Sequence, residues 1–187
     1  MKVIMQPEEL ELFKAFLSEA DAYFEFGMGG STCLAATLVK KRISAVDSDR
    51  VWVSKVRGEI GNSTKHVDLR HVDIGPTGAW GTPVSRENEH LFRSYSGSIV
   101  ETGFRDFDLC LVDGRFRVAC FLQALQFLRP GAIIGIHDYV MRPAYKIVED
   151  FARPIASRQQ LKFFVRRTDW NEMGLKDALE AHRLNWA

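Results

Sequence analysis

A chain of 187 residues, 46% hydrophobic and 26% charged, is long enough for one domain with a buried core and too short for two. Its 25 basic and 24 acidic side chains are interspersed, so the formal charge of +1 leaves no field of one sign to steer the chain onto a nucleic acid. No stretch approaches the roughly 20 apolar residues of a membrane-spanning helix, and the N-terminal residues lack the apolar core of a secretory signal. We therefore expect one cytoplasmic domain over residues 1–187, without a nucleic-acid or membrane partner.

The first part of the chain predicts a helix within residues 1–20 and then a buried strand. Pro7 suits a first helical turn, and apolar residues recur after it at helical spacing. Residues 22–26 are rich in aromatic side chains and stop at the glycine turn 27–30, as a buried strand entering a tight turn does. Ser31 is then expected to cap a second helix, which ends near the basic residues 40–42.

The alternation of strand and helix continues along the chain. Further strands are predicted at 43–46, 66–74, 108–112, 132–136 and 161–166, and helices at 51–60, 118–128 and 144–151. The pattern at 168–187 is ambiguous. Alternating strands and helices joined by short turns predict an α/β fold with a doubly wound, mostly parallel sheet and helices on both faces.

The segment 75–103 interrupts this alternation. It begins with a loop rich in glycine and proline and continues into a predicted helix. A long loop after the carboxyl end of a strand often serves as a lid, so we expect this segment to control substrate access. Trp80, Phe92 and Tyr95 are candidate pocket walls, although ordinary core or lid packing is the better explanation of each of them taken singly.

Polar or acidic groups end the five predicted strands that come before residue 140. Ligands of open parallel sheets bind beyond the carboxyl ends of the strands, near the point where strand order reverses. Each residue taken singly is better explained as a loop residue or a helix cap, but together they predict a ligand site. These strand ends are Glu25 with the glycine turn, Asp47, Asp73, Asp113-Gly114 and His137-Asp138.

The glycine turn and Asp47 together predict an adenosine site. Gly27, Gly29 and Gly30 allow the backbone to approach a ligand closely. Asp47 lies about 20 residues past Gly27, where a carboxylate accepts hydrogen bonds from a ribose diol. Thr32 stands in the place of the third glycine of the dinucleotide fingerprint, so the pair leaves the choice of cofactor open.

The segment 24–32, with sequence Phe-Glu-Phe-Gly-Met-Gly-Gly-Ser-Thr, resembles the glycine-rich first motif of class I S-adenosylmethionine-dependent methyltransferases. The acidic end of the next strand in Ala-Val-Asp47 and the segment Val-Asp73-Ile are also similar to that family. Leu-Val-Asp-Gly114, Leu-Arg-Pro-Gly131 and Ile-His-Asp-Tyr139, in that order, resemble its small-molecule members. The resemblance covers residues 20 to 145 and implies S-adenosylmethionine as cofactor.

The resemblance also implies roles for individual residues. The backbone at the three glycines would pass close to the methionine part of the cofactor, Asp47 would bind the ribose and Asp73 the adenine. Glu25 would orient either the turn or the cofactor's ammonium group, and a strand-end carboxylate that binds the turn's own amides is an equally good interpretation. The complete cofactor-binding set expected is Glu25, Gly27, Gly29, Gly30, Ser31, Thr32, Asp47, Asp73 and Asp113.

Asp113, His137 and Asp138 are the candidate catalytic residues. Adjacent fourth and fifth strands would bring the two carboxylates together, where they could hold Mg²⁺ and through it a substrate oxygen. His137 stands where metal-dependent members of the family have a second acidic residue, which weakens the case for magnesium. It could instead be a general base, or a side chain hydrogen-bonded to a neighbouring loop.

We therefore expect an S-adenosylmethionine-dependent methyltransferase that acts on a small molecule, at oxygen. A methyltransferase-like protein that binds the cofactor without transferring a methyl group is the main alternative. An NAD-dependent oxidoreductase fits less well, because the dinucleotide fingerprint is incomplete and a separate catalytic domain is lacking. The methyl acceptor and the oligomeric state cannot be read from the sequence.

Overall fold

The computed structural model of the chain describes residues 1–186. Within them, seven strands form one sheet in the order β3-β2-β1-β4-β5-β7-β6. The five central strands run parallel, and β7 pairs antiparallel with both β5 and β6. The strands are β1 (Ala22–Phe26), β2 (Arg42–Asp47), β3 (His66–His71), β4 (Leu109–Val112), β5 (Ile133–Ile136), β6 (Ala152–Arg158) and β7 (Leu161–Arg166).

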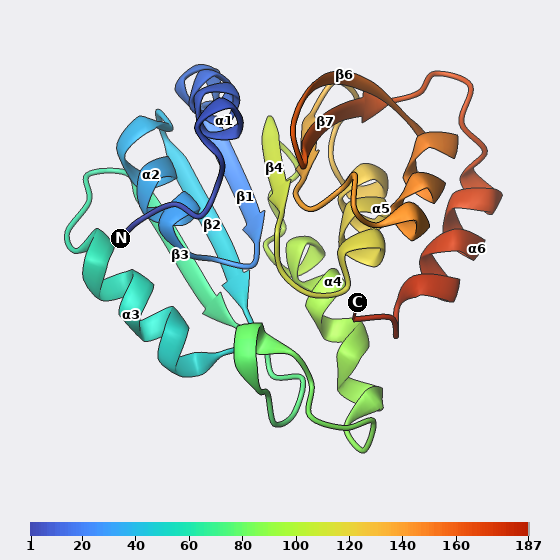
Figure 1. Ribbon diagram of the computed structural model, residues 1–187, viewed down its shortest axis with the longest axis horizontal. Coiled ribbons are helices and arrows are strands. Elements are labelled where there is room, and N and C mark those ends of the chain that lie inside the picture. Colours follow the sequence, from blue (N-terminus) through green and yellow to red (C-terminus); the bar gives the residue numbers. More distant parts are fainter. Residues whose placement is uncertain (187) are drawn as a thin grey trace.

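Helices cover both faces of this sheet (Figure 1), so the predicted doubly wound α/β fold is confirmed. Helices α1, α2 and α3 lie on one face, and α4, α5 and α6 lie on the other. The α-helices are α1 (Pro7–Glu19), α2 (Gly30–Leu38), α3 (Arg50–Ile60), α4 (Phe92–Glu101), α5 (Arg117–Phe127) and α6 (Glu172–His182). Three short 3-10 helices are η1 (Ala79–Gly81), η2 (Glu89–Leu91) and η3 (Pro143–Asp150).

Helix α5 is the best-buried helix of the fold. Its apolar residues recur at helical spacing, as in a helix with one buried face, but nine of its residues, including Gln123, are buried. The reason is that α4 and α6 both pack against it while it lies on the sheet. Arg117, its first residue, is also buried, so the charge of that residue needs partners inside the protein.

The register of the central strands places their carboxyl ends side by side. Phe26 of β1 pairs with Val46 of β2 and with Val112 of β4, and Val112 pairs with Ile136 of β5. The residues that follow these positions therefore emerge at one edge of the sheet. They are Gly27, Asp47, Asp113 and His137.

Some elements differ from the sequence-based expectation. Strand β6 was not predicted, because Pro154 and several exposed polar residues make it look like a loop, and such residues are tolerated only on an edge strand. Strand β3 ends at His71, three residues earlier than expected. Ser31 lies inside α2 and does not cap it, since Gly29 occupies the cap position. Asn171 accepts hydrogen bonds from two backbone amides at the start of α6, within the segment whose structure the sequence left open.

Candidate functional site

A cavity of about 660 Å³ opens at the carboxyl ends of the central strands. The glycine turn, the end of β2, the segment 80–82 and the ends of β4 and β5 line it, together with residues 1–5. This is the place where strand order reverses, because β1 pairs with β2 on one side and with β4 on the other. The volume lies within the range of ordinary small-molecule sites.

The glycine turn requires its glycines for two different reasons. Gly27 has φ +88°, and a Cβ there would lie 2.3 Å from the Cα of Gly114, so only glycine fits between β1 and the end of β4. A Cβ at Gly29 would meet no atom within 4 Å, because this residue faces the open cavity. The turn is therefore fixed by packing at Gly27 and leaves bare backbone at Gly29 for a ligand.

Glu25 stabilises this turn from the protein interior. Its carboxylate accepts hydrogen bonds from the hydroxyl groups of Ser31 and Thr32, the latter at 2.6 Å, and Thr32 in turn accepts one from the amide of Gly29 at 2.9 Å. Burial raises the pKa of Glu25 to about 8. Glu25 and Thr32 are fully buried and do not line the cavity, whereas Ser31 does. Glu25 was considered either as a residue that orients the turn or as a partner of the cofactor's ammonium group, and its geometry matches the first role.

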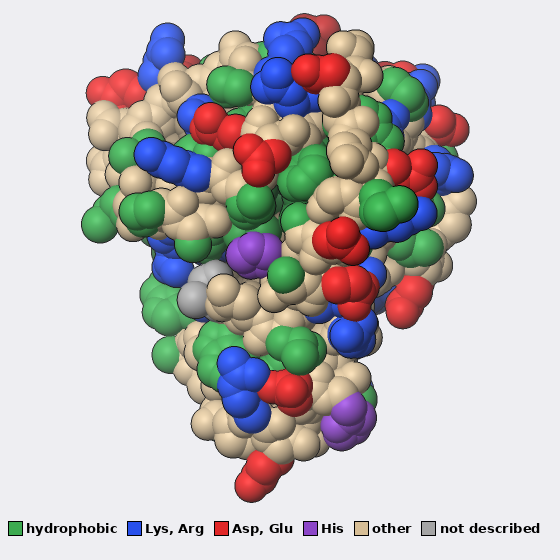
Figure 2. Space-filling view, turned by 90° about the vertical axis from the view of Figure 1, so that its right-hand side faces the viewer, with side chains coloured by type: hydrophobic (Ala, Val, Ile, Leu, Met, Phe, Trp, Pro, Cys, Tyr) green, Lys and Arg blue, Asp and Glu red, His purple; other side chains and the backbone are tan. Residues whose placement is uncertain are grey.

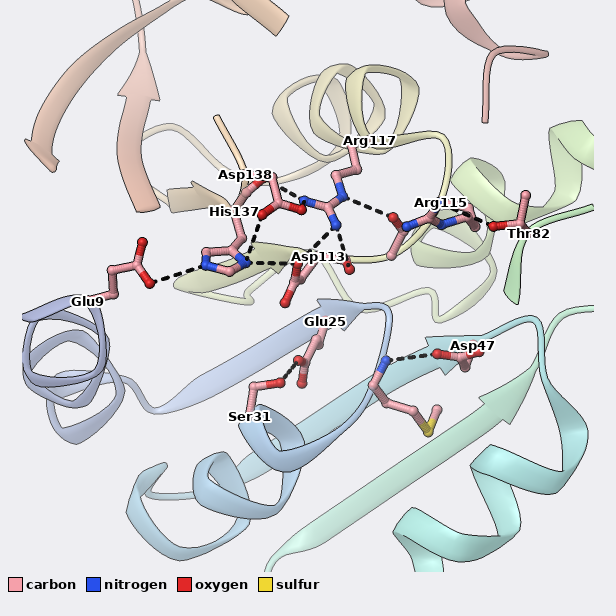
Figure 3. A network of polar contacts seen from close by, with 12 residues as sticks. Glu9, Glu25, Ser31, Asp47, Thr82, Asp113, Arg115, Arg117, His137 and Asp138 are labelled. Atoms are coloured by element: carbon pink, nitrogen blue, oxygen red, sulfur yellow. Dashed lines mark hydrogen bonds and ion pairs between the residues drawn. The ribbon is translucent and has the colours of Figure 1, made fainter. Parts of the chain in front are cut away.

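Asp47 lies in the same cavity as the glycine turn, as the adenosine prediction requires. Its carboxylate accepts hydrogen bonds from the amides of Met28, at 3.1 Å, and Asp49, at 2.9 Å (Figure 3). Each oxygen keeps a further lone pair for a ligand hydroxyl. Burial raises the pKa of Asp47 to about 6, so the group is mainly ionised at neutral pH.

Asp73 is not brought to the cavity. Because β3 ends at His71, Asp73 falls in the following turn, where its carboxylate accepts a hydrogen bond from the amide of Gly75 at 2.9 Å. The loop that follows covers the end of β2 instead, with Ser48 donating a hydrogen bond to the carbonyl of Gly81 at 3.0 Å. The placement gives no support to the expected adenine contact from Asp73.

Within the segment 75–103, only a short stretch reaches the cavity. Trp80 is 79% exposed, has φ +60° and lines the cavity together with Gly81 and Thr82. Phe92 and Tyr95, also considered as pocket walls, belong to α4 and are buried in the core. The lid function of this segment stays a prediction that now concerns residues 80–82.

The other end of the cavity contains the acidic and histidine cluster. Ligand atoms of Asp113, His137 and Asp138 lie within 4.8 Å of one another. Arg117 lies between the two carboxylates, at 3.1 Å from Asp113 and 3.0 Å from Asp138, and donates further hydrogen bonds to the carbonyls of Gly114 and His137 at 3.0 and 2.6 Å (Figure 3). Its guanidinium ties the ends of β4 and β5 together.

His137 is enclosed by carboxylates. Its Nδ1 lies 3.2 Å from Asp113 and its Nε2 lies 3.4 Å from Glu9 of α1. Burial by itself would lower the pKa of His137, but the hydrogen bond to Asp113 and the charges of Asp113, Asp138 and Glu9 raise it to about 9. The imidazole is therefore protonated at neutral pH and does not serve there as a general base. This geometry matches the structural role considered for His137.

The cluster does not fit a resident Mg²⁺ ion. Mg²⁺ needs unengaged oxygen ligands in octahedral geometry, and it takes only a few of them from protein. In this chain the guanidinium of Arg117 and the imidazolium of His137 already neutralise Asp113 and Asp138. The metal role expected for the two carboxylates therefore has no support from the donor set, and no step is derived through a metal.

Sequence reasoning did not foresee the structural roles of three residues of this region, although it considered Arg115 and Arg117 as groups that could attract an acidic substrate or simply face solvent. Glu9 and Arg117 belong to helices, where an acidic or basic residue normally faces water, so their burial had no local signal. Trp52, which donates a hydrogen bond from its indole nitrogen to the carbonyl of Met28 at 2.7 Å, supports the glycine turn from α3. Its only sequence signal is a large aromatic residue soon after Asp47.

The solved structures that resemble the chain are methyltransferases. A methyltransferase-like protein from Silicibacter pomeroyi is 32% identical, covers 98% of this chain and 97% of its own, and superposes with a TM-score of 0.87. An O-methyltransferase from Bacillus cereus, in complex with SAH (S-adenosylhomocysteine), is 16% identical over 87% of this chain and 82% of its own, with a TM-score of 0.60. The chain belongs to the class I S-adenosylmethionine-dependent methyltransferase family.

The remaining comparisons show a likeness of fold at low sequence identity, or find no match. The methyltransferase MycE of the mycinamycin biosynthetic pathway, solved with Mg and SAH, is 12% identical over 87% of this chain and 46% of its own, with a TM-score of 0.53. No family model and no curated protein matches the chain. Membership in the methyltransferase family therefore rests on the fold and on the relative that is 32% identical.

The surface bears on the partners expected for this methyltransferase family member. Figure 2 shows basic and acidic side chains mixed on the face that lies to the right in Figure 1, without a broad area of one sign. Among residues 1–186, no helix has the length and apolar character needed to cross a bilayer. The expectation that no nucleic acid is bound agrees with the mixed charge of this face and stays a prediction.

Proposed function

We propose that this protein is an S-adenosylmethionine-dependent methyltransferase that acts on a small molecule, with oxygen as the acceptor atom. The observation that carries the proposal is the joint placement of bare backbone at Gly29 and the carboxylate of Asp47 in one cavity at the strand ends. An O-methyltransferase of the same fold was solved in complex with SAH, which supports the choice of cofactor. When bound, the cofactor supplies an activated methyl group on a sulfonium.

The residues present fit such a cofactor. The open side of Gly29 admits close approach to the backbone, and Asp47 offers oxygens to a ribose diol. Trp80 and Trp52 line the cavity on the side of Asp47, where aromatic surface suits a nucleoside. Glu25, Ser31 and Thr32 fix the turn, so the glycine backbone is already in place before a ligand arrives.

Transfer to a hydroxyl group requires loss of its proton, and the carboxylates of the cluster are the groups placed to assist it. Asp138 is the more open of the two, with its side chain 38% exposed compared with 23% for Asp113. Arg117 orients both carboxylates, and protonated His137 fixes Asp113 from the other side. Alignment of the acceptor and exclusion of water are the larger tasks in a displacement of this kind.

A cofactor-binding protein without transfer activity is the second candidate, and one observation favours it. Both cluster carboxylates are ion-paired and His137 is protonated. Among the described residues of the cluster, no group is therefore free to accept a proton from a substrate. An acceptor that is already ionised, or one that transfers its proton to Asp138, would reconcile this arrangement with catalysis.

Calorimetric titration with SAH and with NAD tests the cofactor. We expect saturable binding of SAH and none of NAD, and the reverse result would overturn the proposal. Activity is tested by incubation with labelled S-adenosylmethionine and a panel of small hydroxylated compounds, with EDTA or with added Mg²⁺. Transfer in the presence of EDTA supports a metal-independent enzyme, transfer only with Mg²⁺ contradicts the interpretation of the cluster, and binding without transfer favours the second candidate.

A further inference from the structure

The end of the cavity near β4 and β5 carries more positive charge than its own carboxylates neutralise. Arg115, Arg117, Arg142 and His137 line it, against the carboxylates of Asp113 and Asp138, and Glu9 adds a third carboxylate beside His137. All three carboxylates are already paired with Arg117 or His137. The positive charges of Arg115 and Arg142 therefore remain without a carboxylate to neutralise them.

Neither of these two arginines meets a carboxylate within the described residues. Arg115 reaches only the hydroxyl of Thr82, at 3.4 Å, and its Nε is buried without a hydrogen-bond partner. Arg142 lies with its guanidinium 5.7 Å from the ring centre of Tyr145. Both side chains are half-buried at the cavity wall. A partly buried guanidinium without an anion is unfavourable, and at a cavity wall a ligand can supply the missing anion.

Arg115 also lies in the field of other positive charges. Burial lowers the pKa of Arg115, and the positive charges of Arg117 and Arg142 lower it further. The start of α5 lies directly after Arg115, so the positive pole of a long helix adds to the field at this point. An anion between Arg115 and Arg142 would offset this positive field.

We propose that the methyl acceptor is a small organic anion whose carboxylate or phosphate group binds between Arg115 and Arg142. The inference rests on the proposed function, because it concerns the second ligand of the same cavity. Its physical basis is the separation of charge along the cavity, with Asp47 and Asp49 at the end assigned to the nucleoside and the two unpaired arginines at the other. Guanidinium groups bind both carboxylates and phosphates through paired hydrogen bonds.

The test uses three compounds of similar size that differ in charge. Binding of 4-hydroxybenzoate, 4-hydroxyphenyl phosphate and neutral 4-hydroxybenzamide to the protein saturated with SAH is measured by calorimetry. We expect one or both anions to bind about tenfold or more tightly than the amide. The anion that binds more tightly shows whether the site prefers a carboxylate or a phosphate group on the acceptor. Equal binding of all three, or no binding of either anion at millimolar concentration, would overturn the inference.

Two variants locate the anion. Arg115→Met and Arg142→Met should each reduce the advantage of the anion over the amide, while Arg153→Met, on the exposed edge strand β6, should leave it unchanged. The melting temperature of each variant confirms that the protein is folded. SAH affinity is measured in parallel and is expected to change by less than about threefold.

The parallel SAH measurement separates the two proposals. If SAH binds and the anions show no advantage, the inference about the acceptor fails and the methyltransferase proposal stands. If SAH itself does not bind, the proposed function fails. If Arg115→Met and Arg142→Met weaken SAH strongly and leave the anion advantage intact, the arginines bind the cofactor's own carboxylate, and the acceptor assignment is wrong.

Discussion

The β1–β2 end of the cavity is built from backbone, whereas its β4–β5 end is built from charged side chains. At the first end, Gly27 and Gly29 expose main chain, and Asp47 is held by two amides. At the second end, Arg117 and protonated His137 hold their carboxylate partners in a network that is closed on itself. The contrast shows that one end of the cavity offers bare backbone to a ligand, whereas most charged groups at the other end hold two strands in register and leave Arg115 and Arg142 for a ligand.

The largest effect should come from the glycine turn. Gly27→Ala places a Cβ against the backbone of Gly114 at a positive φ, and we expect it to destabilise the fold by about 3 kcal/mol or more and to abolish SAH binding. Gly29→Ala is the matched control for folding, because its Cβ meets open space. Thermal unfolding and SAH titration check both variants. Equal stability of the two would show that the packing of the turn is not as described.

The charged end should add a dependence on pH of its own to that of the buried carboxyl groups at the backbone end. The pKa of His137 is raised from 6.5 to about 9, so its stabilising effect is complete below pH 6.5 and is lost as the pH rises through 9. The loss should be on the order of 3 kcal/mol. Denaturant unfolding at pH 6, 7.5 and 9.5 measures it, with His137→Gln as reference.

The reference variant is needed because buried carboxyl groups titrate in the same range. Burial raises the pKa of Glu25 to about 8 and that of Asp47 to about 6, and an acid with a raised pKa also loses stability as the pH rises. These contributions are common to wild type and His137→Gln, so the difference between the two curves isolates His137. Parallel curves would show that His137 is not held protonated.

Asp47 and Asp73 offer a direct comparison between structure and resemblance. Asp47→Asn removes a charged acceptor inside the cavity and should weaken SAH binding about 30-fold, or about 2 kcal/mol. Asp73→Asn changes a residue that binds its own turn, and SAH binding should be unaffected. Calorimetry measures both. A clear loss with Asp73→Asn would support the adenine contact that the family resemblance implies and would contradict the placement in the structure.

The smallest effect is expected from metal ions on the wild type. Because Arg117 and His137 occupy the carboxylates, Mg²⁺ should neither raise the melting temperature nor change SAH affinity, and EDTA should have no effect. Arg117→Met sharpens the test, since it leaves Asp113 and Asp138 without their main cation. That variant should be less stable, and millimolar Mg²⁺ should restore part of the loss. Saturable Mg²⁺ binding to the wild type would overturn this interpretation.

The sequence was sufficient to locate those parts of the candidate site that are marked by a local residue pattern. The glycine turn and the acidic strand ends are contiguous signals, and a parallel sheet necessarily brings its carboxyl ends to one edge. The sequence did not predict where β3 ends, and so where Asp73 lies, because the length of β3 depends on pairing with β2 and not on its own residues. Arg117 and Glu9 could not be assigned to the cluster, since their partners lie on other elements and long-range pairing leaves no mark in the local sequence.

Strand β6 and helix α5 show the same limit in the fold. Pro154 and the polar residues around it are acceptable only at a sheet edge, and the position of the edge is a property of the whole sheet. The periodicity of α5 resembles that of a surface helix, and its burial is decided by α4 and α6. The residue pattern predicts where most helices and strands lie, but how deeply each one is buried depends on tertiary packing.

The buried carboxylate of Glu9 makes the cluster dependent on three distant parts of the chain. It accepts hydrogen bonds from the amides of Gln6, at 2.8 Å, and Gln160, at 2.6 Å, and it lies beside His137. The first helix, the fifth strand and the closing hairpin must therefore meet before His137 acquires its final surroundings. Since contacts between residues so far apart form slowly, we expect this corner of the molecule to mature late in folding and to be the first to loosen when α1 detaches.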